Sequence, residues 1–372
     1  MNEYLSFYEK YKISPVVQNI DDFTAHRKRR TNLYRMIGVP SILFKDKNIL
    51  EIGPGGGYNT LVTYTYNPKT YTLIEPNSTG FNELKDNLKD LNKGNIYFHN
   101  CMLEDFKTER KYDVIMCEGL IPGLNNKKEF IQNIQKLLNE NGIIIITSAD
   151  EISVFYELIR KYMANVLSQN IENINERVAI LVKAFSSHLD TLDGMSRSYS
   201  DWCLDNLVGE SLLEHTFSMF DAITLFEDDF YFLGSSPDIF TNYTWYKEMA
   251  TQSVNYNSPY KEQFLKKWHT LIDYRYIDNG RDSSQNLELS KLCKTFINAI
   301  KKEETNSVVN ILTAIKTNLQ LDVNDEILKS IEEVIDIVNS GITVDKVYKM
   351  KYFNKAFGRG QSYLSFSKVE QI

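Results

Sequence analysis

Hydrophobic residues in the first 150 positions gather in short runs, each of the length of one buried strand. These runs cover residues 48–53, 70–76, 96–101, 112–119 and 142–149. Between them lie stretches with helical spacing, of which residues 127–142 are the clearest example. Strands that alternate with helices in this way predict a parallel sheet covered by helices on both faces.

The pattern changes after Ala149. Residues 151–215 show helical periodicity, whereas residues 220–237 return to strand character. We expect residues 220–234 to form an antiparallel hairpin, turning at Asp228 and Asp229, that supplies the last two strands of the sheet. From about Tyr243 onward the chain is polar and helical, with residues 324–341 as its clearest helix.

These segments predict four regions. They are an N-terminal helical segment (1–42), an α/β domain (43–150 and 216–237), a helical insertion (151–215) and a helical C-terminal region (238–372). The first region should hold a helix that ends near Gly38 and Pro40. Its basic run at 27–30 is either the solvated face of that helix or a contact for an anionic acceptor.

Composition narrows the class of protein. Of 372 residues, 42% are hydrophobic and 24% charged, as in ordinary globular proteins, and the net charge of −7 argues against broad nucleic-acid binding. The four cysteines and five histidines are scattered, so neither a disulfide framework nor a zinc site is indicated. Without a signal peptide pattern or a membrane-length apolar run, we expect a cytoplasmic protein. Abundant Asn, Lys, Ile and Tyr suggest an AT-rich, bacterial genome.

The first strand candidate ends in a glycine-rich loop, NILEIGPGGGYNT (48–60). Glycine tolerates positive φ and lets a ligand approach the main chain. A loop that opens a helix also points free N–H groups toward that ligand. An ordinary strand-to-helix turn rarely needs four glycines in five positions, so the loop predicts a nucleotide-like ligand.

The spacing of the glycines indicates which ligand. A dinucleotide fingerprint fails because Tyr58 or Thr60 stands where its third glycine should be, and no lysine follows for a phosphate-binding P-loop. The spacing that fits is E-x-G-x-G-x-G, formed by Glu51, Gly53, Gly55 and Gly57. In these residues the chain resembles the class I S-adenosylmethionine-dependent methyltransferases, over about residues 45–150 and 218–237.

The resemblance implies a Rossmann-like, mostly parallel seven-stranded sheet and S-adenosylmethionine as cofactor. It places the glycine loop under the methionine part and Glu51 near the amino group. Glu75, after the second strand, would accept hydrogen bonds from both ribose hydroxyls, a task that suits an acceptor-only carboxylate. Met102 and Leu103 would lie at the adenine, where many members carry Asp at the first position, which leaves backbone groups, Glu104 or Asp105 for the adenine contacts.

The acceptor should enter after the fourth strand, where Glu118 is the first candidate for a general base or acceptor clamp, close to the cofactor. Capping the next helix or binding a loop amide is the alternative role. Asp150, after the fifth strand, is a second catalytic candidate, with N-capping of a helix as its alternative. The segment FGRGQSY (357–363) has the composition of a turn.

The helical insertion contains GMSRSYSDWCLDN (194–206), and in the family such insertions often form a lid over the acceptor. Its substrate-binding candidates are Arg197, Tyr199, Asp201 and Trp202, which suit a polar ligand with one flat apolar face, such as a sugar. The alternative is a helix start capped by Ser200 or Asp201, with Trp202 in the core.

The sequence leaves several classes of methyl acceptor possible. Resemblance to cell-envelope methyltransferases with an EGLLP-like segment favours a small polar molecule, such as a sugar or nucleotide-linked sugar of bacterial glycans. The alternatives are RNA or protein methylation through the C-terminal helices, a cofactor-binding scaffold without catalysis, and aminopropyl transfer from the decarboxylated cofactor. The C-terminal region could also form a homodimer.

Overall fold

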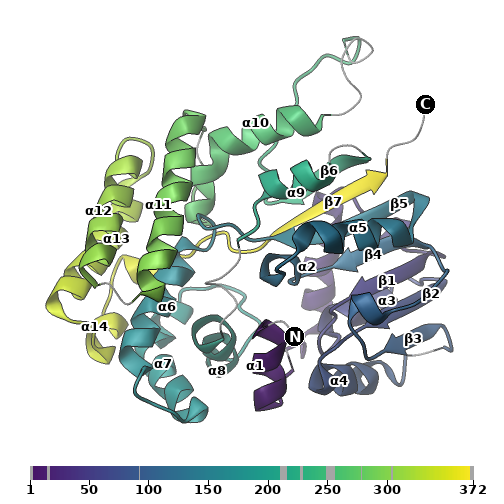
Figure 1. Cartoon of the computed structure of the whole chain (residues 1–372), viewed down its shortest axis with the longest axis horizontal. Coiled ribbons are helices and arrows are strands. Elements are labelled where there is room, and N and C mark those ends of the chain that lie inside the picture. The colour runs from purple at the N-terminus through teal and green to yellow at the C-terminus, as the bar shows by residue number, and fades with distance from the viewer. Residues whose placement is uncertain are drawn as a thin grey trace. The chain divides into compact units, whose positions relative to one another are not determined.

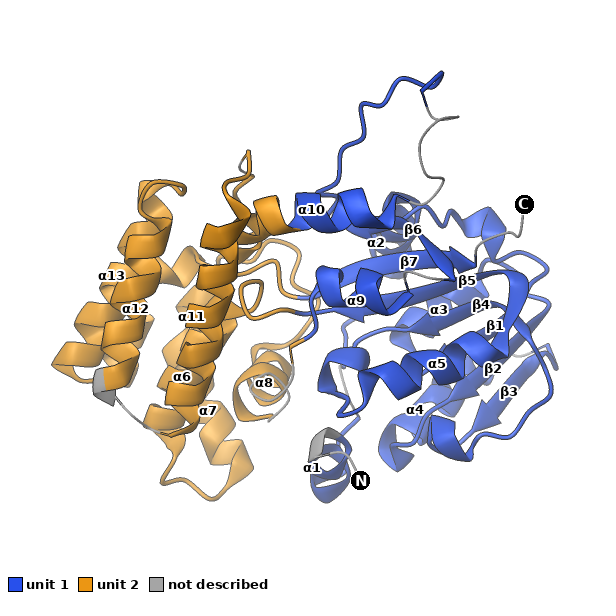
Figure 2. Cartoon of the chain, turned by 45° about the horizontal axis from the view of Figure 1, so that its top comes forward, with its two compact units in different colours: residues 1–149, 217–264, 361–372 blue, residues 150–216, 265–360 orange. Residues whose placement is uncertain are grey.

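A computed structural model describes the chain at residues 3–14, 17–91, 93–209, 216–226, 229–248, 256–277, 279–302 and 305–368. The chain divides into two compact units (Figure 2). The first contains residues 1–149, 217–264 and 361–372, and the second contains residues 150–216 and 265–360.

The first unit is built on a seven-stranded sheet in the order β3-β2-β1-β4-β5-β7-β6 (Figure 1). The strands are β1 (Asn48–Ile52), β2 (Thr70–Ile74), β3 (Ile96–His99), β4 (Tyr112–Cys117), β5 (Leu138–Ser148), β6 (Phe230–Ser236) and β7 (Ser362–Lys368). Strands β1 to β5 pair in parallel, while β7 is antiparallel to both β5 and β6. The predicted Rossmann-like, mostly parallel seven-stranded sheet is confirmed. Its strand order reverses between β1 and β4, which is where ligands of such sheets bind.

The predicted hairpin at 220–234 is wrong. Met219–Phe226 forms helix α9, and β6 pairs with β7 rather than with the segment before it. The side chains of α9 that are buried recur at helical spacing, and Phe226 stacks on Phe366 of β7 with ring centroids 4.3 Å apart. A short apolar run satisfies both periods, so periodicity alone could not separate strand from helix. Asp228 lies outside the described residues.

The seventh strand therefore comes from the C-terminal region, which was expected to be helical. Its sequence, SYLSFSK, alternates polar and apolar residues, with Leu364 and Phe366 fully buried. Ser365 Oγ donates a hydrogen bond to the carbonyl of Ile37, which ties β7 to the end of helix α2. The period-two signal was present in the sequence, but it lies more than 120 residues beyond β6.

Helices lie on both faces of this sheet (Figure 1). The helices of this unit are α1 (Glu3–Tyr11), α2 (Phe23–Met36), α3 (Tyr58–Tyr64), α4 (Ser78–Leu88), α5 (Lys127–Leu137), α9 and α10 (Asn257–Lys267), the last of which continues into the second unit. Helix α2 ends just before Gly38, whose φ of 77° is the left-handed conformation expected after a helix end. Side chains of α2, α3 and α4 pack with β1 and β2 into one apolar core.

The second unit is helical, and its described residues form no strand. It contains α6 (Phe155–Ser168), α7 (Ile174–Leu189), α8 (Tyr199–Cys203), α11 (Ser283–Lys301), α12 (Thr305–Leu319), α13 (Asp325–Ser340) and α14 (Val344–Tyr348). Helix α13 confirms the helix predicted at 324–341. Across the described ranges, no helix has both the length and the apolarity needed to cross a membrane.

Candidate functional site

The glycine loop joins β1 to α3 in a conformation that requires glycine. Gly53, Gly55 and Gly57 have φ values of 72°, 56° and 81°, all left-handed. At Gly57 a Cβ atom would also lie 2.4 Å from Leu84 Cδ1 of helix α4, so the Leu84 side chain would have to move. No side chain therefore covers the main chain at these three positions after β1.

Glu75 follows β2 and holds this loop. Its Oε2 accepts from Gly55 N at 2.8 Å and its Oε1 accepts from Asn77 N at 2.8 Å. The side chain is only 3% exposed, and burial raises the pKa of Glu75 to about 7 although both backbone hydrogen bonds oppose the shift. Each carboxylate oxygen accepts more than one hydrogen bond, so the group can also receive hydroxyl donors from a ligand.

Glu51 lies in β1 on the other side of the loop. Its Oε2 accepts hydrogen bonds from Thr60 Oγ1 at 3.0 Å and from the Tyr71 hydroxyl at 2.5 Å. Burial raises the pKa of Glu51 to about 7, and the hydrogen bond from Tyr71 opposes this. The nearby Glu118 raises the pKa of Glu51 further and Arg30 lowers it, so these three charges lie within electrostatic reach of one another.

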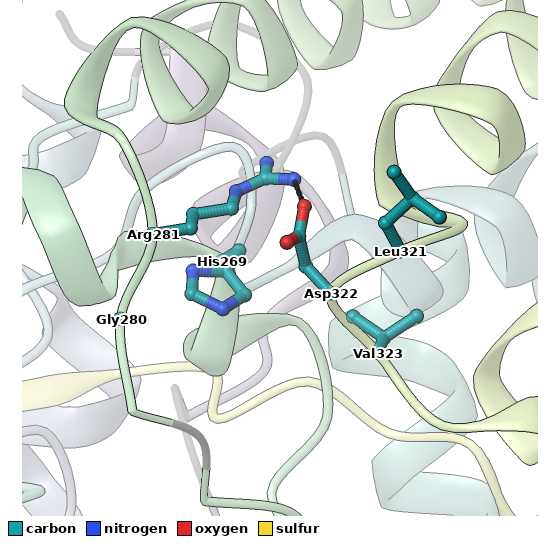
Figure 3. A pocket seen from close by; sticks show the side chains of 6 residues that line it. All are labelled: His269, Gly280, Arg281, Leu321, Asp322 and Val323. Carbon is teal, nitrogen blue, oxygen red and sulfur yellow. Dashed lines mark hydrogen bonds and ion pairs between the residues drawn. The ribbon is translucent and has the colours of Figure 1, made fainter.

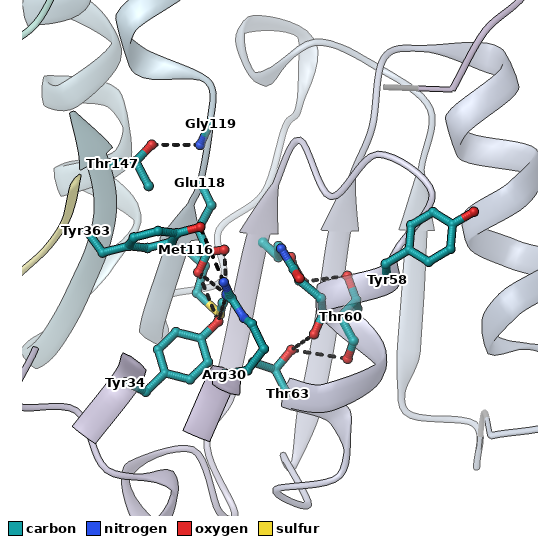
Figure 4. Close-up of polar contacts among 12 residues, drawn as sticks. Arg30, Tyr34, Tyr58, Thr60, Thr63, Met116, Glu118, Gly119, Thr147 and Tyr363 are labelled. Carbon is teal, nitrogen blue, oxygen red and sulfur yellow. Dashed lines mark hydrogen bonds and ion pairs between the residues drawn. The ribbon is translucent and has the colours of Figure 1, made fainter. Parts of the chain in front are cut away.

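Glu118, directly after β4, forms an ion pair with Arg30 of α2 (Figure 4). Arg30 Nη2 lies 2.6 Å from Oε1 and 2.5 Å from Oε2, and the Tyr34 hydroxyl donates to Oε1 at 2.9 Å. The guanidinium lies between two rings, 4.8 Å from the centroid of Tyr34 and 5.5 Å from that of Tyr363. Glu118 therefore neither caps a helix nor binds a loop amide in these contacts.

Both members of this pair are nearly buried, with 7% of the Arg30 side chain and 9% of the Glu118 side chain exposed. Burial by itself would lower the pKa of Arg30, but the Glu118 carboxylate reverses this and holds that pKa well above its usual value. The arginine is thus permanently charged.

The segment after β4 lies against the glycine loop. Leu120 Cδ2 is 3.6 Å from the position that a Cβ would take at Gly53. Gly119 N donates to Thr147 Oγ1 of β5 at 2.7 Å, which fixes the segment at the strand ends (Figure 4). The acidic residues Glu75, Glu51 and Glu118 thus follow the edge of the sheet across β2, β1 and β4.

The residues predicted for adenine follow β3. Leu103 is buried and begins a 3₁₀ turn that ends at Asp105, with Met102 half-buried before it. Asn100 Nδ2 donates to the carbonyl of Glu75 at 2.8 Å. The structure therefore brings Met102 and Leu103 to the same edge as Glu75.

Asp150 belongs to the second unit. Its Oδ1 accepts from the amides of Ile152 and Ser153, both at 3.0 Å, and from Trp268 Nε1 at 2.7 Å. Burial, followed by the charge of Glu151, raises the pKa of Asp150 to about 6. These contacts are those of a residue that caps the chain turn before α6.

The candidates from the helical insertion also lie in the second unit, around α8. Arg197 pairs with Asp205, and the Tyr199 hydroxyl donates to Asp190. Trp202 is buried and meets the Phe357 ring edge-on at 6.4 Å. The cap of α8 is Ser198, whose Oγ accepts from Asp201 N at 3.1 Å, rather than Ser200 or Asp201.

A cavity of about 310 Å³ also lies in the second unit (Figure 3). It is lined by His269, Gly280, Arg281, Leu321, Asp322 and Val323. The Arg281 guanidinium already donates to Asp322 at 2.9 Å, to the Asn318 side chain at 2.8 Å and to Asn286 at 2.7 Å. Its charged group therefore braces the helices around the cavity.

Sequence reasoning missed the group that surrounds Glu118. Arg30 was interpreted as part of a basic run, but Arg27, Lys28 and Arg29 are exposed while Arg30 is buried. His26, Arg30 and Tyr34 recur every four residues and form one buried face of α2, which is a signal that could have identified them. Tyr363, 333 positions away from Arg30, offered no local signal.

Three features together define a Rossmann-like cofactor-binding domain. They are the mostly parallel sheet whose strand order reverses between β1 and β4, the glycine loop at that reversal, and the buried acids at the ends of adjacent strands. Residues 43–202 match the family described as "Methyltransferase domain". The chain contains a class I S-adenosylmethionine-dependent methyltransferase domain, and S-adenosylmethionine is the cofactor of that class.

Two bacterial relatives and one solved structure illustrate the similarity. "Ribosomal protein L11 methyltransferase" of Prochlorococcus marinus is 31% identical over 29% of this chain and 36% of its own length. "Ribosomal RNA small subunit methyltransferase G" of Petrotoga mobilis is 28% identical over 47% of this chain and 76% of its own length. The structure of PKMT2 from Rickettsia typhi in complex with AdoHcy is 17% identical, with a TM-score of 0.45, over 64% of this chain and 49% of that one. The chain thus spans about a third of the first of these relatives.

Proposed function

We propose that this protein binds S-adenosylmethionine along the ends of β2, β1 and β4 and transfers its methyl group to a small polar acceptor. The observation that carries this proposal is the pair of buried carboxylates, Glu75 and Glu51, on the two sides of the left-handed glycine loop. Neither acid has an ion-pair partner among the described residues, so both are available to the polar groups of a ligand.

In this proposal the ribose hydroxyls donate to Glu75, which the amides of Gly55 and Asn77 already hold in place. The amino group of the methionine part lies toward Glu51. Met102 and Leu103, which follow β3, lie toward the adenine. These assignments give the ribose, the amino group and the adenine of the cofactor one proposed contact each.

The cofactor supplies an electrophilic methyl group, so the protein mainly aligns the acceptor and excludes water. Of the two roles considered for Glu118, we favour the acceptor clamp. Arg30 contacts both carboxylate oxygens and Tyr34 contacts one of them, so the position of the Glu118 carboxylate is fixed by these two residues. Asp150 is the weaker catalytic candidate, because its Oδ1 already accepts three hydrogen bonds.

For the acceptor we favour a sugar or nucleotide-linked sugar, with Arg197, Tyr199, Asp201 and Trp202 as the residues proposed to bind it. This choice rests on the resemblance of residues 118–122 to cell-envelope methyltransferases. A cytoplasmic location and a homodimer formed through residues 238–372 belong to the same proposal.

An RNA acceptor is the second candidate. Arg27, Lys28 and Arg29 are exposed on α2 and could meet phosphates, although the net charge of −7 opposes this. Binding of bulk tRNA that weakens steeply with salt would favour RNA over a sugar. A scaffold without catalysis is excluded by any turnover of the cofactor with a cell-extract acceptor.

The test is calorimetric titration of the protein with S-adenosylmethionine, its demethylated product and NAD. We expect micromolar binding of the first two, no binding of NAD, and loss of binding in Glu75→Ala. Binding of NAD alone, or of nothing, would overturn the proposed function.

A further inference from the structure

The segment between β6 and α10 carries large aromatic side chains that the fold leaves in solvent. Tyr243 is 92% exposed, Trp245 56% and Tyr246 69%. The described part of this segment, residues 237–248, extends away from the sheet and beyond α10 (Figures 1 and 2). Exposed aromatic residues that gather on one loop are typical of a contact with a partner.

The base of this segment is fixed to the first unit. Phe240 packs on Phe232 of β6 and on Tyr260 of α10, with ring centroids 5.1 Å and 5.0 Å apart. The amide of Thr241 donates to Gln263 Oε1 of α10 at 2.8 Å. The aromatic residues that follow are therefore presented from an anchored base.

Trp245 and Tyr246 form what we call the aromatic corner. Their ring centroids lie 6.0 Å apart and their ring planes meet at 78°. A turn in which Glu248 N donates to the carbonyl of Trp245 at 2.9 Å encloses Lys247, whose Nζ lies 5.0 Å from the centroid of Trp245 and 5.9 Å from that of Tyr246. An ammonium at this distance is attracted by the electron-rich faces of the rings. Among the described residues no carboxylate forms an ion pair with Lys247, so these rings hold its charge.

The ammonium of Lys247 thus shows which chemistry the aromatic corner accepts. We propose that the aromatic corner binds a lysine side chain of a partner protein, and prefers one that is methylated on its nitrogen, in the place that Lys247 takes in the free protein. Methylation keeps the positive charge but removes N–H groups that bind water, so the ammonium leaves water at a lower cost and meets the rings with a larger surface. The inference goes beyond the proposed function and concerns residues that take no part in it.

The exposure of the aromatic corner favours a protein over a free small molecule. Sites for small molecules are concave and enclose most of the ligand, whereas these rings lie on an exposed loop. A partner protein can add contacts around the lysine, for example with Tyr243, which gives the exposed loop an area that a small cation lacks.

The charge of the loop favours a basic partner over a nucleic acid. Residues 237–248 contain two acids, Asp238 and Glu248, and one base, Lys247, and the whole chain carries a net charge of −7. Single-stranded nucleic acids also stack on exposed aromatic rings, but their binding sites add a positively charged groove. The negative charge here is complementary to a lysine-bearing surface.

The test uses three synthetic Gly-Ser peptides that differ at one central position, which is trimethyllysine, lysine or the uncharged norleucine. Binding is measured as protection of tryptophan emission from quenching by acrylamide. Trp202 and Trp268 are only 8% and 5% exposed, so the quenchable emission comes mainly from Trp245. Calorimetry with the same peptides measures binding to variants that lack this tryptophan.

We expect wild type to bind the trimethyllysine peptide about 10-fold more tightly than the norleucine peptide, with the lysine peptide between them. Trp245→Leu should lose most of this preference. Lys247→Met removes the internal competitor and should raise affinity for the trimethyllysine peptide roughly 2- to 5-fold. Tyr97→Leu is the matched control, because Tyr97 is also exposed and lies under a cation, Arg110, at 4.7 Å, and it should change nothing.

Equal affinity for the trimethyllysine and norleucine peptides, binding of none of the three, or weaker binding by Lys247→Met would overturn the proposal. Tetramethylammonium that binds as tightly as the trimethyllysine peptide would overturn the protein partner in favour of a small cation. Binding of oligouridylate that Trp245→Leu abolishes would assign the aromatic corner to RNA instead. A dimer in sedimentation equilibrium that Trp245→Leu dissociates would show that a second copy of the chain covers the loop, which also overturns the proposal.

Discussion

Glu51 and Glu75, on the two sides of the glycine loop, are stabilised in a different way from Glu118, the third acid along this edge of the sheet. Glu51 and Glu75 receive hydrogen bonds from hydroxyls and amides, without an ion-pair partner among the described residues, and burial raises the pKa of each to about 7. Glu118 instead is paired with the buried Arg30. The first two acids are thus buried without a compensating charge, at a cost to stability, whereas the third has a cation of the protein beside it.

The largest effect should come from breaking the ion pair. Arg30→Met leaves the Glu118 carboxylate buried without its cation, and we expect a loss of about 3–5 kcal/mol in the free energy of unfolding. Urea denaturation at neutral pH measures it. Arg27→Met, on the exposed side of the same helix, is the matched control and should change stability by less than about 0.5 kcal/mol.

The double variant Arg30→Met/Glu118→Gln should recover most of that loss, because no charge is then left alone. If it is as unstable as Arg30→Met, the ion pair is not the reason for the destabilisation, and the packing of Arg30 between Tyr34 and Tyr363 is.

Substitution of Glu51 should change the free energy of unfolding in the opposite direction, because removing its charge should stabilise the protein. Its pKa is raised to about 7 in the folded protein, so its stabilising contribution is present below its unfolded pKa and is lost as pH rises through 7. Glu51→Gln imitates the protonated acid and keeps an oxygen for Thr60 and Tyr71. We expect it to stabilise the cofactor-free protein by roughly 2–3 kcal/mol at pH 8.

At pH 5 the acid is protonated in the folded protein and still largely ionised in the unfolded chain, so the gain from Glu51→Gln should shrink to about 1 kcal/mol or less. Denaturation of both proteins at the two pH values measures this. A gain of the same size at pH 5 would show that packing, and not the charge of Glu51, is responsible.

The same acids should make cofactor binding depend on pH. Glu75 and Glu51 must be ionised to accept from the ribose and to face the ammonium, and each has a pKa raised to about 7. Affinity for S-adenosylhomocysteine should therefore fall by about 10-fold per acid between pH 8 and pH 6. Calorimetry across this range measures it, with Glu51→Gln expected to show a shallower dependence. A flat profile in wild type would contradict the assignment of both acids.

The positions of Glu51 and Glu75 beside the glycine loop could be predicted from the sequence, whereas the ion pair between Arg30 and Glu118 could not. Glu51 and Glu75 are placed by local pattern, because consecutive parallel strands end at one edge of the sheet. Arg30, Tyr363 and Glu118 come from a helix before β1, from the last strand and from the end of β4, and only the folded sheet brings them together. The same reason explains the missed β7, whose partners β5 and β6 are far away in sequence.

The smallest expected effect separates the two tyrosines that enclose Arg30. The Tyr34 hydroxyl accepts from Arg30 at 2.5 Å and donates to Glu118 at 2.9 Å, whereas the Tyr363 hydroxyl is 3.4 Å from Arg30. Tyr34→Phe should therefore cost about 1–2 kcal/mol of unfolding free energy, and Tyr363→Phe less than about 0.5 kcal/mol, since each keeps its ring over the guanidinium. Urea denaturation measures both losses. Equal losses of unfolding free energy would mean that the Tyr363 hydroxyl stabilises Arg30 as much as the Tyr34 hydroxyl does. The ion pair would then be a network spanning α2, β4 and β7.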